Sequence, residues 1–94
     1  MKVRVTFLGI LAEYASLPYL DLEMGEGTSV RDLLREVGSQ FSGRWPKEVW
    51  DAHQSRFGPM VGVFLDEREV EDEDARLHDG SEVILLPMMA GGQR

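Results

Sequence analysis

The sequence predicts an α+β domain in which one amphipathic helix packs on a small mixed β-sheet. Two short segments near the start alternate apolar and polar residues, a helical pattern follows them, and two strongly apolar runs come after the helix. The chain has 94 residues, which is enough for one hydrophobic core and too few for two. We therefore expect a single domain.

The first two strands are predicted over residues 2–8 and 17–24, because apolar and polar side chains alternate in both segments. Residues 10–15 between them are predicted as a turn or a short helical connector. Gly25 and Gly27 end the second strand. The side chains expected on the buried face are Val3, Val5, Phe7, Leu20, Leu22 and Met24.

The main helix is predicted to begin at Thr28 or Ser29, because either hydroxyl can accept a hydrogen bond from the free N–H groups of the first turn. Apolar residues then recur at the spacing of one helix face. They are Val30, Leu33, Leu34, Val37 and Phe41. We expect Gly38 to lie at the end of this helix as its C-cap.

Residues 42–58 are predicted to contain a second short helix that begins at Pro46, whose missing N–H costs nothing in a first turn. Four residues of this segment then fall on one face of the helix. They are Val49, Trp50, His53 and Phe57. We expect the aromatic side chains of Trp50 and Phe57 to cover the edge of the core.

Three further strands are predicted after this segment. The nearly continuous apolar run 60–65 indicates a strand that is buried on both sides or central in its sheet. Residues 66–70 indicate a tight turn into a short strand. Asp79-Gly80 is a turn signal, and residues 83–86 form the last strand, which Pro87 ends.

The last strand is expected to lie beside the first and parallel to it, because a helical crossover separates the two. This is the β-grasp arrangement of ubiquitin, a mixed sheet of four to five strands with one main helix and a second short helix. We expect residues 1–90 to form the β-grasp domain. Residues 91–94 are expected to be a flexible Gly-Gly tail with a Gln-Arg extension.

Composition excludes several classes of function. The net charge of −7 has the wrong sign for a nucleic-acid binder, and no apolar run approaches the length of a membrane span. The chain has no cysteine, and its two histidines are far apart, so no metal site is expected. The first residues do not resemble a secretory signal, and a cytoplasmic location is therefore expected.

Negative charge is concentrated late in the chain. The segment 66–82 holds nine acidic and two basic residues and carries a net charge of −7, whereas the rest of the chain is neutral. Such a segment suits a basic protein partner. It is equally well explained as a solvated loop that keeps a small protein in solution.

The sequence contains no catalytic motif, so a self-contained enzyme is not expected and no bound cofactor is predicted. The distinctive feature is Gly91-Gly92, which follows closely on the last strand. Two residues without Cβ make a narrow strand that can enter a closed channel in a partner. A terminal carboxylate on it can attack the α-phosphate of ATP to give an acyl-adenylate, which a sulfur donor converts into a thiocarboxylate.

The whole chain resembles the MoaD/ThiS group of ubiquitin-like sulfur carriers, and is similar in particular to the small subunit of molybdopterin synthase. The resemblance is carried by segments 3–7, 28–34 and 79–87, the last of which leads to Gly91-Gly92. It implies a thiocarboxylate at Gly92 and activation by a MoeB-like adenylating enzyme that uses ATP. It also implies a molybdopterin synthase large subunit or another sulfur acceptor as partner.

The resemblance further implies that the last strand and its neighbours present an apolar patch to these partners. The residues assigned to the patch are Phe7, Phe64, Leu86, Met88 and Met89. A mature carrier ends at Gly92, so a trimming protease is expected to remove Gln93-Arg94. Where relatives carry Asn-Gly in the turn after the third strand, this chain has Asp66-Glu67-Arg68.

Three functions stay open at this point. The first is a sulfur carrier of the MoaD type. The second is a ubiquitin-like modifier that is joined through Gly92 to lysines of target proteins. The third is a non-covalent interaction module that uses the acidic segment 66–82 and needs no tail.

Overall fold

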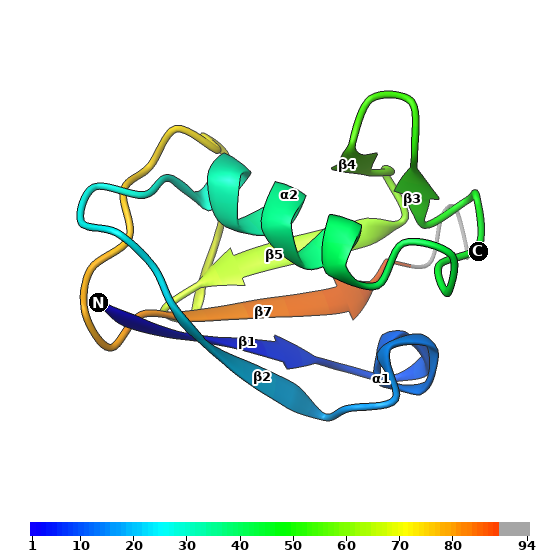
Figure 1. The fold of residues 1–94 in the computed structure, drawn as a ribbon, viewed down its shortest axis with the longest axis horizontal. Coiled ribbons are helices and arrows are strands. Elements are labelled where there is room, and N and C mark those ends of the chain that lie inside the picture. The colour runs from blue at the N-terminus through cyan, green and yellow to red at the C-terminus, as the bar shows by residue number, and fades with distance from the viewer. Residues whose placement is uncertain (89–94) are drawn as a thin grey trace.

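The computed structural model describes residues 1–88. The chain forms, in order, β1 (Lys2–Phe7), α1 (Ile10–Ala15), β2 (Tyr19–Glu23), α2 (Val30–Gln40), β3 (Trp50–Asp51), β4 (Arg56–Phe57), β5 (Val61–Leu65), β6 (Arg68–Glu69) and β7 (Glu82–Pro87). Five strands form one sheet in the order β2-β1-β7-β5-β6, and α2 crosses one of its faces (Figure 1). The predicted α+β, β-grasp fold is confirmed.

The last strand, β7, lies in the middle of the sheet between β1 and β5. It runs parallel to β1, with Val83 beside Val5, and antiparallel to β5, with Ile84 beside Phe64. The predicted parallel placement of the first and last strands is confirmed. Because β7 is central, the residues that follow it begin in the middle of the sheet and not at an edge.

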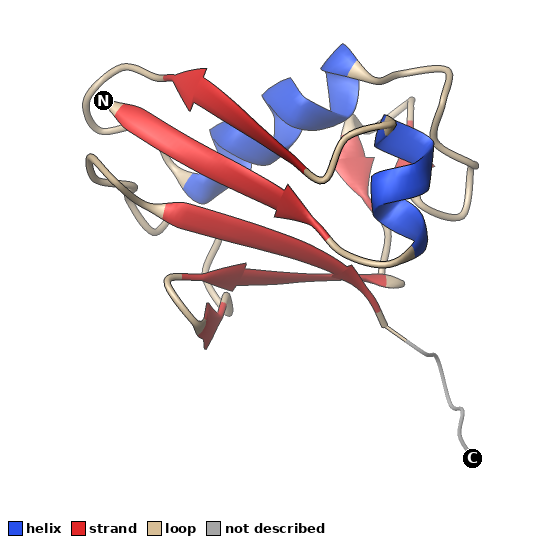
Figure 2. Ribbon diagram, turned by 90° about the horizontal axis from the view of Figure 1, so that it is seen from below, coloured by secondary structure: helices blue, strands red, loops and turns tan. Residues whose placement is uncertain are grey.

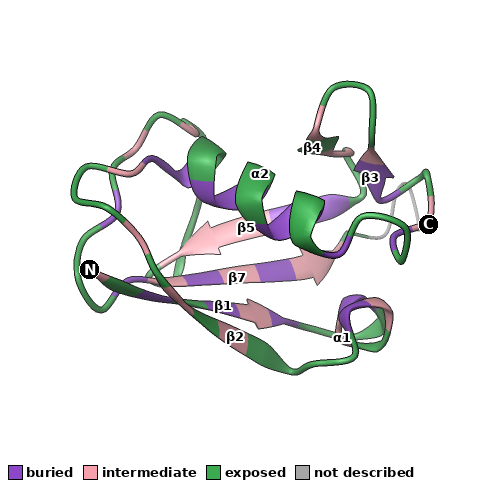
Figure 3. Cartoon of the chain, in the orientation of Figure 1, coloured by how far each residue is buried: buried purple, intermediate pink, exposed green. Residues whose placement is uncertain are grey.

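The hydrophobic core fills the space between α2 and the sheet (Figure 3). Alternate side chains of the strands point into it, so Val5, Val83 and Leu85 are fully buried. The whole predicted apolar stripe of α2 is buried as well. Ser29 caps the helix, since its hydroxyl accepts a hydrogen bond of 3.1 Å from the backbone N–H of Asp32.

The prediction that Gly38 is the C-cap of α2 is wrong. The helix continues to Gln40, and Gly38 is buried against the indole ring of Trp50. A Cβ at this position would overlap the ring. The glycine therefore serves the close approach of β3 to the helix and not the end of the helix.

The prediction of a second helix after Pro46 is also wrong. The carbonyl of Pro46 accepts hydrogen bonds from the N–H groups of Val49 and Trp50, which makes a single turn, and β3 and β4 then pair as a hairpin. Trp50 lies opposite Phe57 in this hairpin, with ring centroids 4.9 Å apart. The predicted role of both rings at the edge of the core is confirmed. The second, shorter helix of the fold is α1.

The turn between β5 and β6 is a two-residue hairpin turn. Asp66 and Glu67 have φ angles of 48° and 75°, and two-residue hairpins require such positive angles. β5 pairs with a strand on each side, as predicted for a central strand. Burial on both faces is not found, because no helix of residues 1–88 covers the second face (Figure 2).

Candidate functional site

An apolar patch lies on the open face of the sheet, the face turned away from α2. It consists of Phe64, Ile84, Leu86 and Met88, which we call the open-face patch. The first three are half-buried and Met88 is exposed. Phe64 lies directly opposite Ile84 in the paired strands, so their side chains share this face. The patch therefore follows from the register of β5 and β7.

Gly62 forms the floor of one end of this patch. It is paired with Leu86, and a Cβ at this position would lie only 2.7 Å from the sulfur of Met88. The missing side chain lets Met88 lie across β5. The backbone N–H of Met88 also donates a 2.6 Å hydrogen bond to the carbonyl of Met60. Met88 is thus fixed against β5, although it follows the last residue of β7.

Further apolar side chains surround the end of β7. Leu8 is 43% exposed and Met60 is 41% exposed. Gly9, with a φ of 56°, brings the chain before α1 against the ring of Pro87, because its Cβ position lies 3.3 Å from that ring. Exposed apolar residues gathered at one place are typical of a docking surface for another protein. Met88, the last residue that the structure describes, lies at this corner of the sheet.

The predicted patch residues divide into three groups. Phe64, Leu86 and Met88 lie on the open-face patch. Phe7 does not, because it is 2% exposed and packs edge-on against Phe41 in the core. Its assignment to the surface is corrected, since it shares the buried face with Val3 and Val5. Four predicted elements lie outside the described residues, namely Met89, Gly91, Gly92 and the Gln93-Arg94 extension.

This surface includes three residues that were not predicted, namely Leu8, Met60 and Ile84. Ile84 is separated from Leu86 by one residue, so strand alternation places both on the same face. This signal was available in the sequence. Met60 had no such signal, because its position depends on the hydrogen bond to Met88 across two strands.

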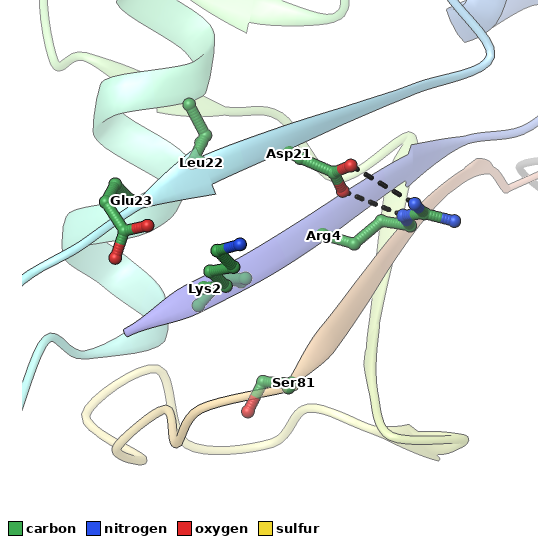
Figure 4. A pocket seen from close by; sticks show the side chains of 8 residues that line it. Lys2, Arg4, Asp21, Leu22, Glu23 and Ser81 are labelled. Atoms are coloured by element: carbon green, nitrogen blue, oxygen red, sulfur yellow. Dashed lines mark hydrogen bonds and ion pairs between the residues drawn. The ribbon is translucent and has the colours of Figure 1, made fainter.

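The other half of the open face is polar. An open depression of about 480 Å³ lies over β1 and β2 and is lined by charged residues of both strands (Figure 4). The Arg4 guanidinium donates two hydrogen bonds, of 2.8 and 3.1 Å, to the two carboxylate oxygens of Asp21. This contact lowers the pKa of Asp21. The side chains of Arg4 and Asp21 are therefore engaged with each other, and neither is available as a free acid or base.

Parts of the acidic segment 66–82 are built into the fold. The carboxylate of Asp66 accepts a 3.0 Å hydrogen bond from the N–H of Glu82 and lies 3.0 Å from Nε2 of His78. The carbonyl of Asp79 and the carboxylate of Asp66 together raise the pKa of His78. Asp74 pairs with Arg31 of α2. These contacts hold the segment against the sheet and the helix.

Residues 1–88 hold neither a cluster of metal ligands nor a membrane-spanning helix. No group of three or more histidine, aspartate or glutamate side chains is placed to hold a metal ion. No helix in this part of the chain combines the length and the apolar composition that crossing a membrane requires.

The central C-terminal strand, the mixed sheet and the single long helix across it define a ubiquitin-like β-grasp protein. The chain belongs to the ThiS family, a family of ubiquitin-like sulfur carriers whose sequence model matches residues 5–92. The resemblance to the MoaD/ThiS group is thereby confirmed. No curated protein sequence matches the chain.

Solved structures share the fold of this chain. SAMP1 of Haloferax volcanii superposes with a TM-score of 0.80 at 16% identity, over 98% of this chain and 100% of its own. A Pyrococcus furiosus protein described as a putative molybdopterin converting factor, subunit 1, superposes with a TM-score of 0.75 at 25% identity. The match covers 95% of this chain and 99% of its own. A chain from the protein–protein complex of subunits 1 and 2 of the Helicobacter pylori molybdopterin-converting factor superposes with a TM-score of 0.62 at 20% identity, over 98% of this chain and 100% of its own.

Proposed function

We propose that this protein is a sulfur carrier of the MoaD type, which delivers sulfur for molybdopterin biosynthesis from a thiocarboxylate at Gly92. The observation that carries the proposal is that the family match runs through Gly91-Gly92 and ends at residue 92. The two glycines follow the central strand β7 after only a few residues. The reactive group is then a main-chain carboxylate, so no catalytic side chain is required.

The proposed chemistry has two steps and needs a partner enzyme. The Gly92 carboxylate attacks the α-phosphate of ATP, pyrophosphate leaves, and an acyl-adenylate forms. A sulfur donor then displaces AMP and leaves the thiocarboxylate. A MoeB-like adenylating enzyme would supply the ATP site. Because the chain continues to Arg94, a trimming protease must first remove Gln93-Arg94.

The open-face patch is proposed to dock the partners of this chemistry. Phe64, Leu86 and Met88 lie beside the end of β7, so a partner that covers them also receives the segment that follows. Met is suited to several partners because its side chain is flexible and polarizable. The relative from Helicobacter pylori is a protein–protein complex of subunits 1 and 2, which supports a large subunit as one of these partners.

Intact-mass analysis of the protein purified from its native host tests the proposal. We expect a fraction of molecules to lack Gln93-Arg94 and to carry one sulfur in place of one oxygen. A host strain without the adenylating enzyme should give the trimmed protein with oxygen only. If every molecule keeps Arg94 under all growth conditions, the protein does not carry sulfur in this way.

A second function, protein modification through Gly92, is favoured by the likeness to SAMP1, a small archaeal modifier protein. The fold and the activating chemistry are the same in both cases, so only the products differ. Immunoblots of host lysate should then show conjugates of higher mass that disappear when Gly92 is deleted. A lysate with thiocarboxylate and no conjugates would support the carrier function alone.

A further inference from the structure

A small cavity lies between α2 and the β3–β4 hairpin, on the side of the sheet opposite the open-face patch (Figure 1). Its volume is about 150 Å³. Three arginines line it, namely Arg31 and Arg35 of α2 and Arg56 of β4. Arg31 and Arg35 are one helical turn apart and share a flank of the helix. We call this cavity the arginine notch.

The three arginines differ in the acidic groups around them. Arg31 pairs with Asp74, and its Nε lies 3.8 Å from Oε1 of Glu73, which also lines the notch. Arg35 and Arg56 form no ion pair with any acidic side chain of residues 1–88. Two guanidinium groups of the notch are therefore left without a close counter-charge.

The acidic neighbours of these two arginines do not neutralise them. Asp51 lies opposite Arg56 in the hairpin, but its Oδ1 accepts hydrogen bonds of 2.9 and 3.0 Å from two backbone N–H groups of the hairpin loop. Asp32 and Glu36 are close to Arg35 along the helix, yet neither of them lines the notch. Arg35 and Arg56 thus face a shared cavity as like charges, which repel each other unless an anion lies between them.

The rest of the lining also suits an oxyanion. Gln54 and Ser55 of the hairpin loop carry an amide and a hydroxyl, which can both donate hydrogen bonds. Leu34 is buried and Phe57 is half-buried, so they form an apolar wall. Such a wall lowers the local dielectric constant and strengthens the attraction between the arginines and an anion.

We propose that the arginine notch binds a phosphate group, either as inorganic phosphate or as a phosphate ester. Near pH 7 a phosphate ester carries a charge of about −1.5 to −2, which matches the two arginines that lack a counter-charge. Guanidinium groups also bind phosphate oxygens through two parallel hydrogen bonds. A carboxylate fits less well, because its single charge would neutralise only one of the two. The notch and the open-face patch lie on opposite sides of the sheet, so this proposal is independent of the sulfur-carrier function.

An NMR titration of the full-length protein with inorganic phosphate tests the proposal. The backbone amide and arginine Nε–H signals are followed at constant ionic strength. We expect saturable shifts at Arg35, Ser55 and Arg56. Acetate and chloride at the same ionic strength should give weak shifts that do not saturate. A higher concentration of sodium chloride should weaken the binding of phosphate.

Four substitutions separate a specific site from the effect of net charge. Arg35→Gln and Arg56→Gln should each bind phosphate about tenfold more weakly, because each removes a charged hydrogen-bond donor. Arg68→Gln is the matched control, since it removes the same charge from an exposed arginine of β6 that does not line the notch. Glu73→Gln removes the carboxylate that faces the ligand and should strengthen binding about threefold. Circular dichroism checks that each variant folds.

Phosphoserine as a second probe distinguishes the two sources of the phosphate group. Binding as tight as that of inorganic phosphate means that the notch accepts an ester, and binding of inorganic phosphate alone means that the ligand is the free anion. Equal binding of acetate and phosphate would overturn the proposal. Equal losses in Arg35→Gln and Arg68→Gln would also overturn it, because binding would then follow net charge. An unchanged affinity in Glu73→Gln would show that phosphate does not lie in the notch.

Discussion

The two faces of the sheet are built from the same strands and differ in what covers them. On the helix side Val5, Val83 and Leu85 are fully buried. On the open side Phe64, Ile84 and Leu86 are half-buried with no helix of residues 1–88 above them. A strand that only needed to fold would carry polar residues on its exposed face. Apolar residues on both faces of β7 therefore fit a strand that serves the fold with one face and, as proposed above, docks a partner with the other.

The sharpest test of this difference uses two adjacent leucines of β7. Leu85→Ala removes a fully buried side chain and should lower the free energy of unfolding by about 3 kcal/mol. Leu86→Ala removes a half-buried side chain and should cost less than about 1 kcal/mol. Urea unfolding followed by circular dichroism measures both.

The order of the two leucine variants should reverse when partner binding is measured in place of stability. Leu86→Ala is expected to weaken the complex with the adenylating enzyme, whereas Leu85→Ala, wherever it stays folded, is expected to leave that complex unchanged. Equal losses of stability in the two variants would mean that the open face is covered in the native protein. The two faces would then not have the separate roles described above.

The next largest difference in stability is expected between alanine substitutions at two glycines, one on each side of the sheet. Gly38→Ala places a methyl group against the buried ring of Trp50 and should destabilise by about 2 kcal/mol, although alanine favours a helix by about 1 kcal/mol. Gly62→Ala meets the Sδ and Cγ atoms of Met88 and touches a methyl group of Leu86, but the exposed Met88 side chain can change its rotamer while its backbone stays hydrogen-bonded to Met60. Its cost should stay below about 1 kcal/mol. Thermal unfolding of both variants measures the difference.

The contact with Trp50 can be isolated by a double-mutant cycle. In a Trp50→Leu background the ring is gone, so Gly38→Ala should become neutral or stabilising through helix propensity. If Gly38→Ala already stabilises the unchanged protein, the helix and β3 are not in close contact at this position.

The helix-covered face was predictable because alternation and helical spacing are local signals. Val3, Val5 and the apolar stripe of α2 follow from them directly. The role of Gly38 was not predictable, because it depends on Trp50, a residue distant in the sequence. A short helix was predicted from Pro46 because the spacing of Trp50 and Phe57 also fits one face of a helix, whereas the structure pairs the two rings across the strands of a hairpin.

The sequence predicted the Gly-Gly motif of the candidate site but only part of its apolar patch, again because only local patterns can be read directly. Gly91-Gly92 is a local motif, and the ThiS family match covers it. The patch residues were chosen by residue type and not by strand alternation, so the buried Phe7 was included and Ile84 was left out. Burial in a strand with apolar residues on both faces cannot be read from the strand alone, because both faces look like core.

The turn at the edge of the open face should give a smaller effect of the opposite sign. Glu67 has a φ of 75°, which costs a residue with a Cβ about 1 kcal/mol. Glu67→Gly should remove this cost and stabilise the protein by about 0.5 kcal/mol after the added entropy of the unfolded chain. Glu69→Gly removes the same charge from β6, where it should destabilise. The urea midpoints of the two variants measure these changes in stability. Equal changes in Glu67→Gly and Glu69→Gly would mean that relief of backbone strain at Glu67 does not cause the stabilisation.

The smallest effect is expected where the acidic segment meets the start of β7. His78 lies 3.0 Å from the Asp66 carboxylate, and its pKa is raised first by the Asp79 carbonyl and then by Asp66. A raised pKa in the folded state means that the charged ring stabilises the fold. This contribution to stability is complete below the ordinary histidine pKa of about 6.5 and is lost as the pH rises through the raised pKa.

The urea midpoint of the unchanged protein should therefore fall across this pH range relative to the midpoint of His78→Gln. Because the ring is exposed, the difference should be small, and a midpoint difference that stays constant with pH would show that the pair with Asp66 contributes nothing to stability.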